Sequence, residues 1–275
     1  MDINIKDIPI YYKIHGEGFP IIMLHGYSPD HRIMSGCMEP IFKNRPGYQR
    51  IYFDLPGMGQ TPTPDWLNCS DQMLEIVQAF IEAIIPGQHY LLVGESYGGY
   101  LARAFIKEQA DLIEGVMFIC PLIDPLHRSE LPPMTILEKD TAFTATLPAE
   151  MQTELDNIAV IQTPETYARL AAEVHVGLRS ADQPFLDRFY AQGYPLSMDL
   201  DDLAAPFTKP TLFITGRQDN IVGYQSAWDI IAQYPRATFV VLDIAGHNAQ
   251  IEQPELFDVL THNWLDRVEK ELSTN

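Results

Sequence analysis

The feature that most constrains how this chain can fold is a serine held between a strand-like run and a helix-like run. Residues 91–93 are apolar, and apolar side chains recur with helical spacing over 100–106, so the chain must turn sharply between them. A turn this tight strains the backbone at Ser96 and crowds the positions two residues away, which explains glycine at 94 and 98. The pattern predicts a Ser96 hydroxyl exposed at a sheet edge, with the Tyr97 amide at a helix N-terminus.

Around this turn the chain alternates between buried strands and amphipathic helices. An antiparallel strand pair is predicted over 2–6 and 10–14, at the sheet edge. Asn68 or Ser70 is expected to cap the helix that runs to residue 85. The alternation with short links predicts a mostly parallel sheet with helices on both faces. The predicted buried strands are 20–24, 50–53, 89–93, 114–120, 210–214 and 238–242, and the predicted core helices are 31–45, 70–85, 97–109, 224–233 and 254–270.

Between residues 121 and 206 the alternation of predicted strands and helices stops. Prolines cluster near its start, no strong strand is evident, and 149–161 and 165–176 have helical patterns. We therefore expect a helical insertion over the carboxyl edge of the sheet. The predicted division is a core in two parts, 1–120 and 207–275, with the insertion at 121–206.

Charge and cysteine content limit the partners and the compartment. The net charge of −19 over 275 residues disfavours nucleic acid and anionic membrane surfaces as partners and indicates a well-solvated surface. A small-molecule substrate is the expected partner, on the basis of the candidate catalytic residues and not of the charge. Three cysteines without metal-like spacing suggest neither a disulfide framework nor a zinc site. The N-terminus lacks a signal-peptide pattern and no apolar run is long enough to span a bilayer. A cytoplasmic protein is expected.

Three polar residues follow three different predicted parallel strands, in the order Ser96, Asp219, His247. The carboxyl ends of parallel strands share one edge of a sheet, where open α/β sheets bind ligands. A serine hydroxyl needs a base to become nucleophilic, and histidine is suited to that task near neutral pH. Asp219 would fix the imidazole tautomer. Backbone amides of Tyr97 and of the loop at Tyr27 would form an oxyanion hole.

At this point the chain resembles the α/β-hydrolase fold family over most of its length. The landmarks that carry the resemblance are His25-Gly26, the loop at 54–59, the serine turn at 94–99, the loop at 216–219 and Gly246-His247. The resemblance implies a mostly parallel eight-stranded sheet flanked by helices, with a helical cap. It also implies that Ser96 is the nucleophile, His247 the base and then the acid, and Asp219 the orienting acid. The amides of Tyr27 and Tyr97 would be the oxyanion donors, without a cofactor or metal.

Several residues have competing interpretations. Asp124 is an alternative to Asp219, because some relatives carry the acid after the equivalent strand. His25 is expected to be structural and bonded to backbone, with contact to the substrate as the alternative. Asp54 is expected to cap its loop rather than to act as a catalyst. Glu95, beside the serine, is expected to be solvated, and the alternative is that it tunes the pKa of a group in the site. The remaining histidines lack ligand spacing, so no metal is predicted.

The favoured hypothesis is a serine hydrolase of small or medium carboxylic esters that works through an acyl-enzyme. A serine at position 96 disfavours similarity to haloalkane dehalogenases and epoxide hydrolases, whose nucleophile is an aspartate. The serine turn also departs from the Gly-Gly-Ser-Trp-Gly pattern of proline iminopeptidases. The alternatives are the same triad used for C–C bond hydrolysis, acyl transfer or aminopeptidase chemistry, or a ligand-binding member with little turnover.

Overall fold

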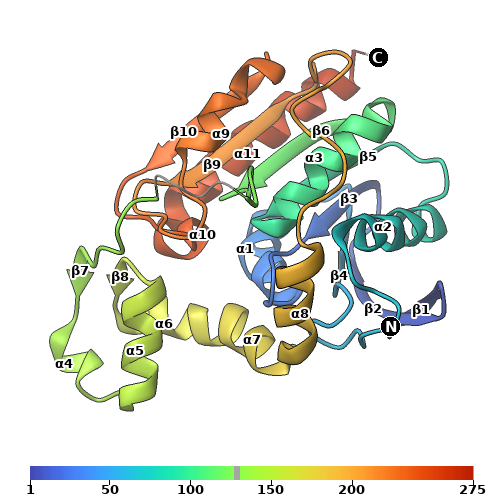
Figure 1. Ribbon diagram of the computed structural model, residues 1–275. Helices are drawn as coiled ribbons and strands as arrows, with labels where there is room; N and C mark the ends of the chain where they lie inside the picture. The colour runs from blue at the N-terminus through green and yellow to red at the C-terminus, as the bar shows by residue number, and fades with distance from the viewer. Residues whose placement is uncertain (127–130, 275) are drawn as a thin grey trace.

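The computed structural model describes residues 1–126 and 131–274, and the fold of this part is organised around one eight-stranded sheet (Figure 1). The strand order is β1-β2-β4-β3-β5-β6-β9-β10. The β1–β2 and β2–β4 pairs are antiparallel, and every later pair is parallel. The strands are β1 (Asp2–Ile5), β2 (Ile8–His15), β3 (Phe19–Leu24), β4 (Tyr48–Phe53), β5 (Tyr90–Glu95), β6 (Ile113–Ile119), β9 (Thr211–Gly216) and β10 (Ala237–Leu242). The predicted mostly parallel sheet with an antiparallel edge is confirmed.

The central strands are buried along their whole length because helices cover both faces of the sheet. β5, β6 and β9 are buried at every residue, as their continuous apolar sequences predict. α1 (Arg32–Phe42) and α11 (Pro254–Leu272) cover one face, whereas α2 (Ser70–Ile84) and α3 (Tyr97–Gln109) cover the other (Figure 1).

The helices differ from the predictions mainly at their ends. α1 stops at Phe42, before the predicted end, although it tolerates Pro40. The N-cap of α2 is Cys69 and makes no side-chain capping hydrogen bond, so the prediction of Asn68 or Ser70 is wrong. The reason is tertiary, since the Ser70 hydroxyl bonds the Tyr97 hydroxyl and the Tyr194 carbonyl instead. The predicted helix 224–233 is split into α9 (Gln225–Asp229) and the 3-10 turn η3 (Ile231–Gln233).

The segment between β6 and β9 is mainly helical and lies beside the carboxyl edge of the sheet (Figure 1). The predicted helix 149–161 is α5, which ends at Ile158. The predicted helix 165–176 is α6, followed by a π-helical turn, η2, and then α7. Two short strands pair in parallel apart from the main sheet. The elements are β7 (Glu138–Lys139), α4 (Thr141–Thr144), α5 (Ala149–Ile158), β8 (Ile161–Gln162), α6 (Pro164–Leu170), η2 (Ala171–His175), α7 (Val176–Ser180) and α8 (Gln183–Gly193).

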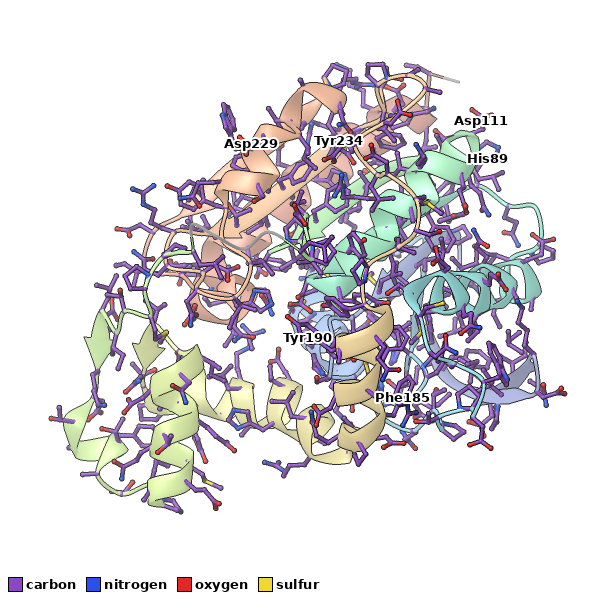
Figure 2. The ribbon with its side chains drawn as sticks, viewed as in Figure 1. His89, Asp111, Phe185, Tyr190, Asp229 and Tyr234 are labelled. Carbon is purple, nitrogen blue, oxygen red and sulfur yellow. The ribbon has the colours of Figure 1, made fainter. Side chains whose placement is uncertain are left out.

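The three candidate catalytic residues lie at the same end of the sheet. Ser96 follows β5 directly, Asp219 follows the end of β9, and His247 follows β10, so all three lie at the carboxyl edge. His89 and Asp111 lie at the opposite end, away from the helices of the segment after β6 (Figure 2). Between β10 and α11, the remaining helix is α10 (Ala249–Glu252), and η1 (Ala110–Leu112) follows α3. None of the described helices has the length and apolarity needed to cross a bilayer.

Candidate active site

Ser96 stands at a strained corner between β5 and α3. Its φ of 51° and ψ of −115° lie outside the regions that residues with a side chain normally adopt. The corner is held by backbone bonds on both sides, from the Ser96 N–H to the Ile119 carbonyl at 3.0 Å and from the Leu122 N–H to the Ser96 carbonyl at 3.0 Å. The strained conformation is therefore held by the neighbouring strand β6 and by the loop that follows it.

The glycines around Ser96 are required by close backbone contacts. A Cβ at Gly94 would overlap the backbone of Gly98, as the sequence pattern predicts. A Cβ at Gly98 would overlap the carbonyl of Leu24, at the end of β3. The turn is therefore packed against both its own strand and the neighbouring one, which points the serine side chain away from the sheet.

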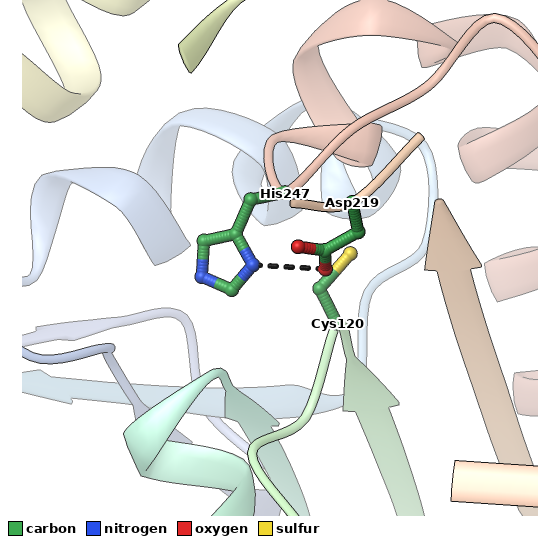
Figure 3. A group of neighbouring side chains, drawn as sticks. All are labelled: Cys120, Asp219 and His247. Carbon is green, nitrogen blue, oxygen red and sulfur yellow. Dashed lines mark hydrogen bonds and ion pairs between the residues drawn. The ribbon is translucent and has the colours of Figure 1, made fainter. Parts of the chain in front are cut away.

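His247 joins Ser96 to Asp219. Its Nε2 lies 3.0 Å from the Ser96 Oγ, and its Nδ1 lies 3.0 Å from the Asp219 Oδ2 (the latter contact is drawn in Figure 3). Since the carboxylate faces Nδ1, it holds the ring proton there and leaves Nε2 to accept the serine proton. The other Asp219 oxygen accepts the N–H groups of Ile221 and Val222, at 2.9 and 3.0 Å. Asp219 is fully buried, so these bonds fix its orientation.

Two backbone amides border this site. Tyr97 is the first residue of α3, so its amide lies at a helix N-terminus, where negative charge is favoured. Tyr27 belongs to the loop after β3. A Cβ added at its neighbour Gly26 would meet Glu95 and the Ser96 side chain, so this loop lies against the serine. Both residues therefore lie close to Ser96 along the chain or in space, and the role of their amides as oxyanion donors stays a prediction.

A cavity of about 270 Å³ opens over the serine. Its floor includes Ser96 and His247, and Ile158, Val174 and Tyr190 from the segment after β6 line its walls. Tyr190 projects from α8, on which Phe185 also lies (Figure 2). The lining is mostly apolar, with a few polar groups near the serine, as is usual for small-molecule sites.

The alternative residues have other positions. Asp124 Oδ1 accepts the Leu126 N–H at 2.8 Å, whereas the imidazole Nδ1 is held by Asp219. His25 is buried, and burial lowers its pKa. Its Nδ1 donates to the Gly26 carbonyl at 2.7 Å and its Nε2 accepts the Leu55 N–H at 2.9 Å, which confirms a structural role.

Asp54 caps its loop as predicted. Its Oδ1 accepts the N–H and the Nδ1–H of His31, at 2.9 and 2.7 Å, and its Oδ2 accepts the Gln60 N–H at 2.9 Å. Asp54 and His31 form a compact buried group with Asp30. Its carboxylate oxygens are already used by N–H donors of the protein, so the group is explained without an ion.

Cys120 lies beside the Asp219–His247 pair (Figure 3). Burial raises the pKa of its thiol well above the usual range, and its Sγ faces the Gly246 carbonyl at 3.6 Å. A buried thiol in this state is a poor metal ligand and a poor nucleophile, because both roles need the thiolate. The structure gives Cys120 a packing role next to the pair.

Comparison with known proteins agrees with this fold. Residues 20–254 match the family model described as the alpha/beta hydrolase fold. The chain belongs to the α/β-hydrolase fold family. A solved α/β superfamily hydrolase from Oenococcus oeni PSU-1 superposes with a TM-score of 0.86 at 31% identity, covering 94% of this chain and 96% of that one.

Curated relatives of this α/β hydrolase are esterases and other hydrolases. A pimeloyl-[acyl-carrier protein] methyl ester esterase from Aeromonas hydrophila is 27% identical over 252 residues, covering 90% of this chain and 96% of that protein. A 2-hydroxy-6-oxo-6-(2'-aminophenyl)hexa-2,4-dienoic acid hydrolase from Metapseudomonas resinovorans is 23% identical, covering 96% of this chain and 90% of that protein. These similarities support a hydrolase.

An aromatic cluster joins the core of this α/β hydrolase to α8. The Tyr97 ring stacks on Tyr194 with centroids 5.1 Å apart, and Tyr27 meets both rings edge to face. The Tyr27 hydroxyl also donates to the Leu186 carbonyl of α8. The side chains next to the predicted oxyanion amides thus anchor the wall of the cavity, a role that cannot be read from the sequence pattern.

Glu252 forms a second link between the segment after β6 and the loop that carries His247. This buried carboxylate accepts the Gly246 N–H at 2.6 Å, and the N–H groups of Val160 and Ile161 at 2.6 and 3.4 Å. Burial raises its pKa to about 7, although the three N–H groups favour the charged form. Because Gly246 precedes His247, Glu252 fixes the imidazole loop relative to β8.

Glu252→Ala is expected to lower the free energy of unfolding by about 3 kcal/mol or more at pH 8. The substitution leaves three buried N–H groups without an acceptor, and each such loss costs about 1–3 kcal/mol. Urea denaturation would measure the change, with Glu255→Ala as a matched control on an exposed glutamate. The control should stay within about 0.5 kcal/mol of the wild type. Equal stability of Glu252→Ala and the wild type would contradict this role.

The prediction that Glu95 is solvated is wrong. The residue is 1% exposed rather than solvated, because it ends β5 beneath the Gly26 loop. Its Oε1 lies 3.4 Å from the His247 Nε2. A charged residue directly before a predicted nucleophile can indicate a role in the site. The sequence alone does not show whether its side chain points into the protein or into solvent.

Proposed function

We propose that this protein is a serine hydrolase that cleaves a small or medium carboxylic ester, or a related acyl compound, through an acyl-enzyme. The observation that carries the proposal is the continuous hydrogen-bonded chain from Ser96 through His247 to Asp219, on the floor of an apolar cavity. Such a chain supplies a nucleophile, its base and the residue that orients the base. The esterase relatives support the same reaction class.

The geometry supports the following sequence of steps. The Ser96 Oγ attacks the ester carbonyl while its proton passes to His247 Nε2, at 3.0 Å. Asp219 stabilises the imidazolium that results. The negative charge on the former carbonyl oxygen is received by the amides of Tyr27 and Tyr97. His247 then protonates the leaving alcohol, and water, activated by the same imidazole, releases the acid.

Residues 121–206 act in this proposal as a cap that selects the substrate. Side chains of α5, η2, α7 and α8 line the cavity above the serine. Tyr27 and Glu252 attach this segment to the core at two separate points. Specificity would therefore depend on the insertion, whereas the chemistry depends on the two core parts, 1–120 and 207–275. We also propose a cytoplasmic location, in keeping with the acidic composition and free cysteines.

A second candidate uses the same three residues on a C–C bond. The similarity to a 2-hydroxy-6-oxo-dienoic acid hydrolase favours it, and the serine, imidazole and cavity would serve there as well. Comparing turnover of a β-diketone with that of a simple aryl ester separates the two. Faster turnover of the diketone would favour C–C hydrolysis.

A panel of p-nitrophenyl esters of graded chain length tests the ester proposal. The cavity volume of about 270 Å³ lies at the low end for small-molecule sites. We expect the highest kcat/KM for acyl chains of about eight carbons or fewer, and at least a roughly tenfold lower value for the dodecanoate. Ser96→Ala is the matched control. Turnover by the wild type no faster than by Ser96→Ala, with thermal stabilisation by the esters, would indicate a ligand-binding protein instead.

A further inference from the structure

Glu95 is a buried acid that the proposed steps do not use. Its side chain lines the cavity, directly before Ser96. One oxygen, Oε1, lies 3.4 Å from the His247 Nε2. The other, Oε2, is enclosed against the Gly26 loop, and apart from the nearby Gly26 amide it has no hydrogen-bond partner within the described part of the chain. Glu252, by contrast, is satisfied by three N–H groups.

A buried carboxyl group with so few hydrogen-bond donors around it is not explained by a structural role as a carboxylate. A buried charge normally requires partners, and leaving a buried polar atom unpaired costs free energy. The oxygen available to a ligand is Oε1, because Oε2 is enclosed against Gly26, whereas Oε1 lies beside the His247 Nε2 where the side chain borders the cavity. Nε2 must approach both the serine oxygen and the leaving oxygen, so a group 3.4 Å from Nε2 lies close to the scissile bond.

The surroundings of Glu95 favour its neutral form up to about neutral pH. Burial and the negative charge of Asp219 raise its pKa to about 7, against the opposing effects of His247 and the Gly26 amide. Two further titratable groups act with it, the buried thiols of Cys37 and Cys120, whose pKa values are also raised. These thiols are neutral at physiological pH and do not favour the charged form of Glu95.

We propose that Glu95 is a substrate-binding residue whose protonated carboxyl group donates a hydrogen bond to a second oxygen of the substrate, close to the scissile ester. This inference rests on the proposed esterase function. It defines the substrate class as esters that carry an oxo, hydroxyl or further carbonyl oxygen within a few bonds of the ester. In a mostly apolar cavity, one buried donor discriminates strongly against an analogue without the acceptor.

The test compares matched esters on three forms of the enzyme. The substrates are ethyl pentanoate and its 2-oxo, 3-oxo and 4-oxo derivatives, followed by acid release. The enzymes are the wild type, Glu95→Gln, which keeps a neutral donor, and Glu95→Leu, which removes it. For at least one oxo position, the ratio of kcat/KM to that of ethyl pentanoate should fall about tenfold in Glu95→Leu and be largely retained in Glu95→Gln. Intrinsic reactivity of the esters cancels in this double ratio.

The pH dependence of the same ratio provides a second readout. In the wild type the oxo preference should be present below pH 7 and decline above it, as the donor becomes a carboxylate. In Glu95→Gln it should stay constant, and this comparison needs no folded Glu95→Leu. A wild-type ratio that is independent of pH, or equal in all variants, would overturn the inference while leaving ester hydrolysis intact. Absence of any turnover above Ser96→Ala would overturn the proposed function as well.

Discussion

His247→Ala is expected to lower kcat for a p-nitrophenyl ester by about 10⁵–10⁶-fold, the loss seen when the base of a comparable triad is removed. The imidazole is the group within hydrogen-bonding distance of the Ser96 Oγ at 3.0 Å, and without it the hydroxyl is a weak nucleophile. KM should change little, because His247 contributes one face of a cavity that is mostly apolar. Stopped-flow or long-time steady-state assays would measure the residual rate.

His89→Ala is the matched control for this prediction. His89 lies at the opposite end of the sheet and is about half exposed, with its Nδ1 2.7 Å from Glu114 (Figure 2). Its removal should leave kcat within about twofold of the wild type, since surface changes of this kind usually have small effects. A His247→Ala enzyme that keeps more than about a tenth of wild-type activity would show that another base is used.

Asp219→Asn is expected to lower kcat by about 10⁴-fold through the tautomer of the imidazole. The Oδ1 of Asp219 accepts two backbone N–H groups, so an asparagine would keep its oxygen there and turn its NH₂ toward His247 Nδ1. Nδ1 would then have to accept, and the proton would move to Nε2, where it blocks proton transfer from Ser96. The overall fold should be retained.

Asp124→Asn distinguishes the two candidate acids. Since Asp219 is the carboxylate at 3.0 Å from Nδ1, we expect Asp124→Asn to keep kcat within about threefold of the wild type. Steady-state kinetics of both variants on one ester would decide between them. A large loss in Asp124→Asn with a small loss in Asp219→Asn would reverse the assignment.

The parts of the fold that the sequence predicts are those governed by local rules. The strands beside the serine turn are continuous apolar runs, and Gly94 and Gly98 are needed by a backbone that a Cβ would disrupt. The order of Ser96, Asp219 and His247 along the chain, each after a strand, placed them at one sheet edge without knowledge of the intervening 121–206 segment. Strand ends were predicted to within one or two residues.

What the sequence did not predict depends on tertiary contacts. Serine is a favoured N-cap residue, but the Ser70 hydroxyl hydrogen-bonds the Tyr97 hydroxyl and the Tyr194 carbonyl instead. The N-cap of α2 is therefore Cys69. α8 was not predicted, because its stabilising aromatic contacts are with Tyr27 and other residues far away in the chain. The burial of Glu95 and the hydrogen bond of Glu252 with Val160 also depend on contacts between residues far apart in the chain, so they were not predicted.

The proposed reaction depends above all on the Ser96 hydroxyl as the nucleophile. Intact-mass spectrometry after exposure to a fluorophosphonate tests it most directly, because the reagent bonds covalently to an activated serine oxygen. We expect one adduct on the wild type, mapped to the peptide that contains Ser96, and none on Ser96→Ala. Equal labelling of both proteins, or a folded wild type that takes up no label, would contradict it.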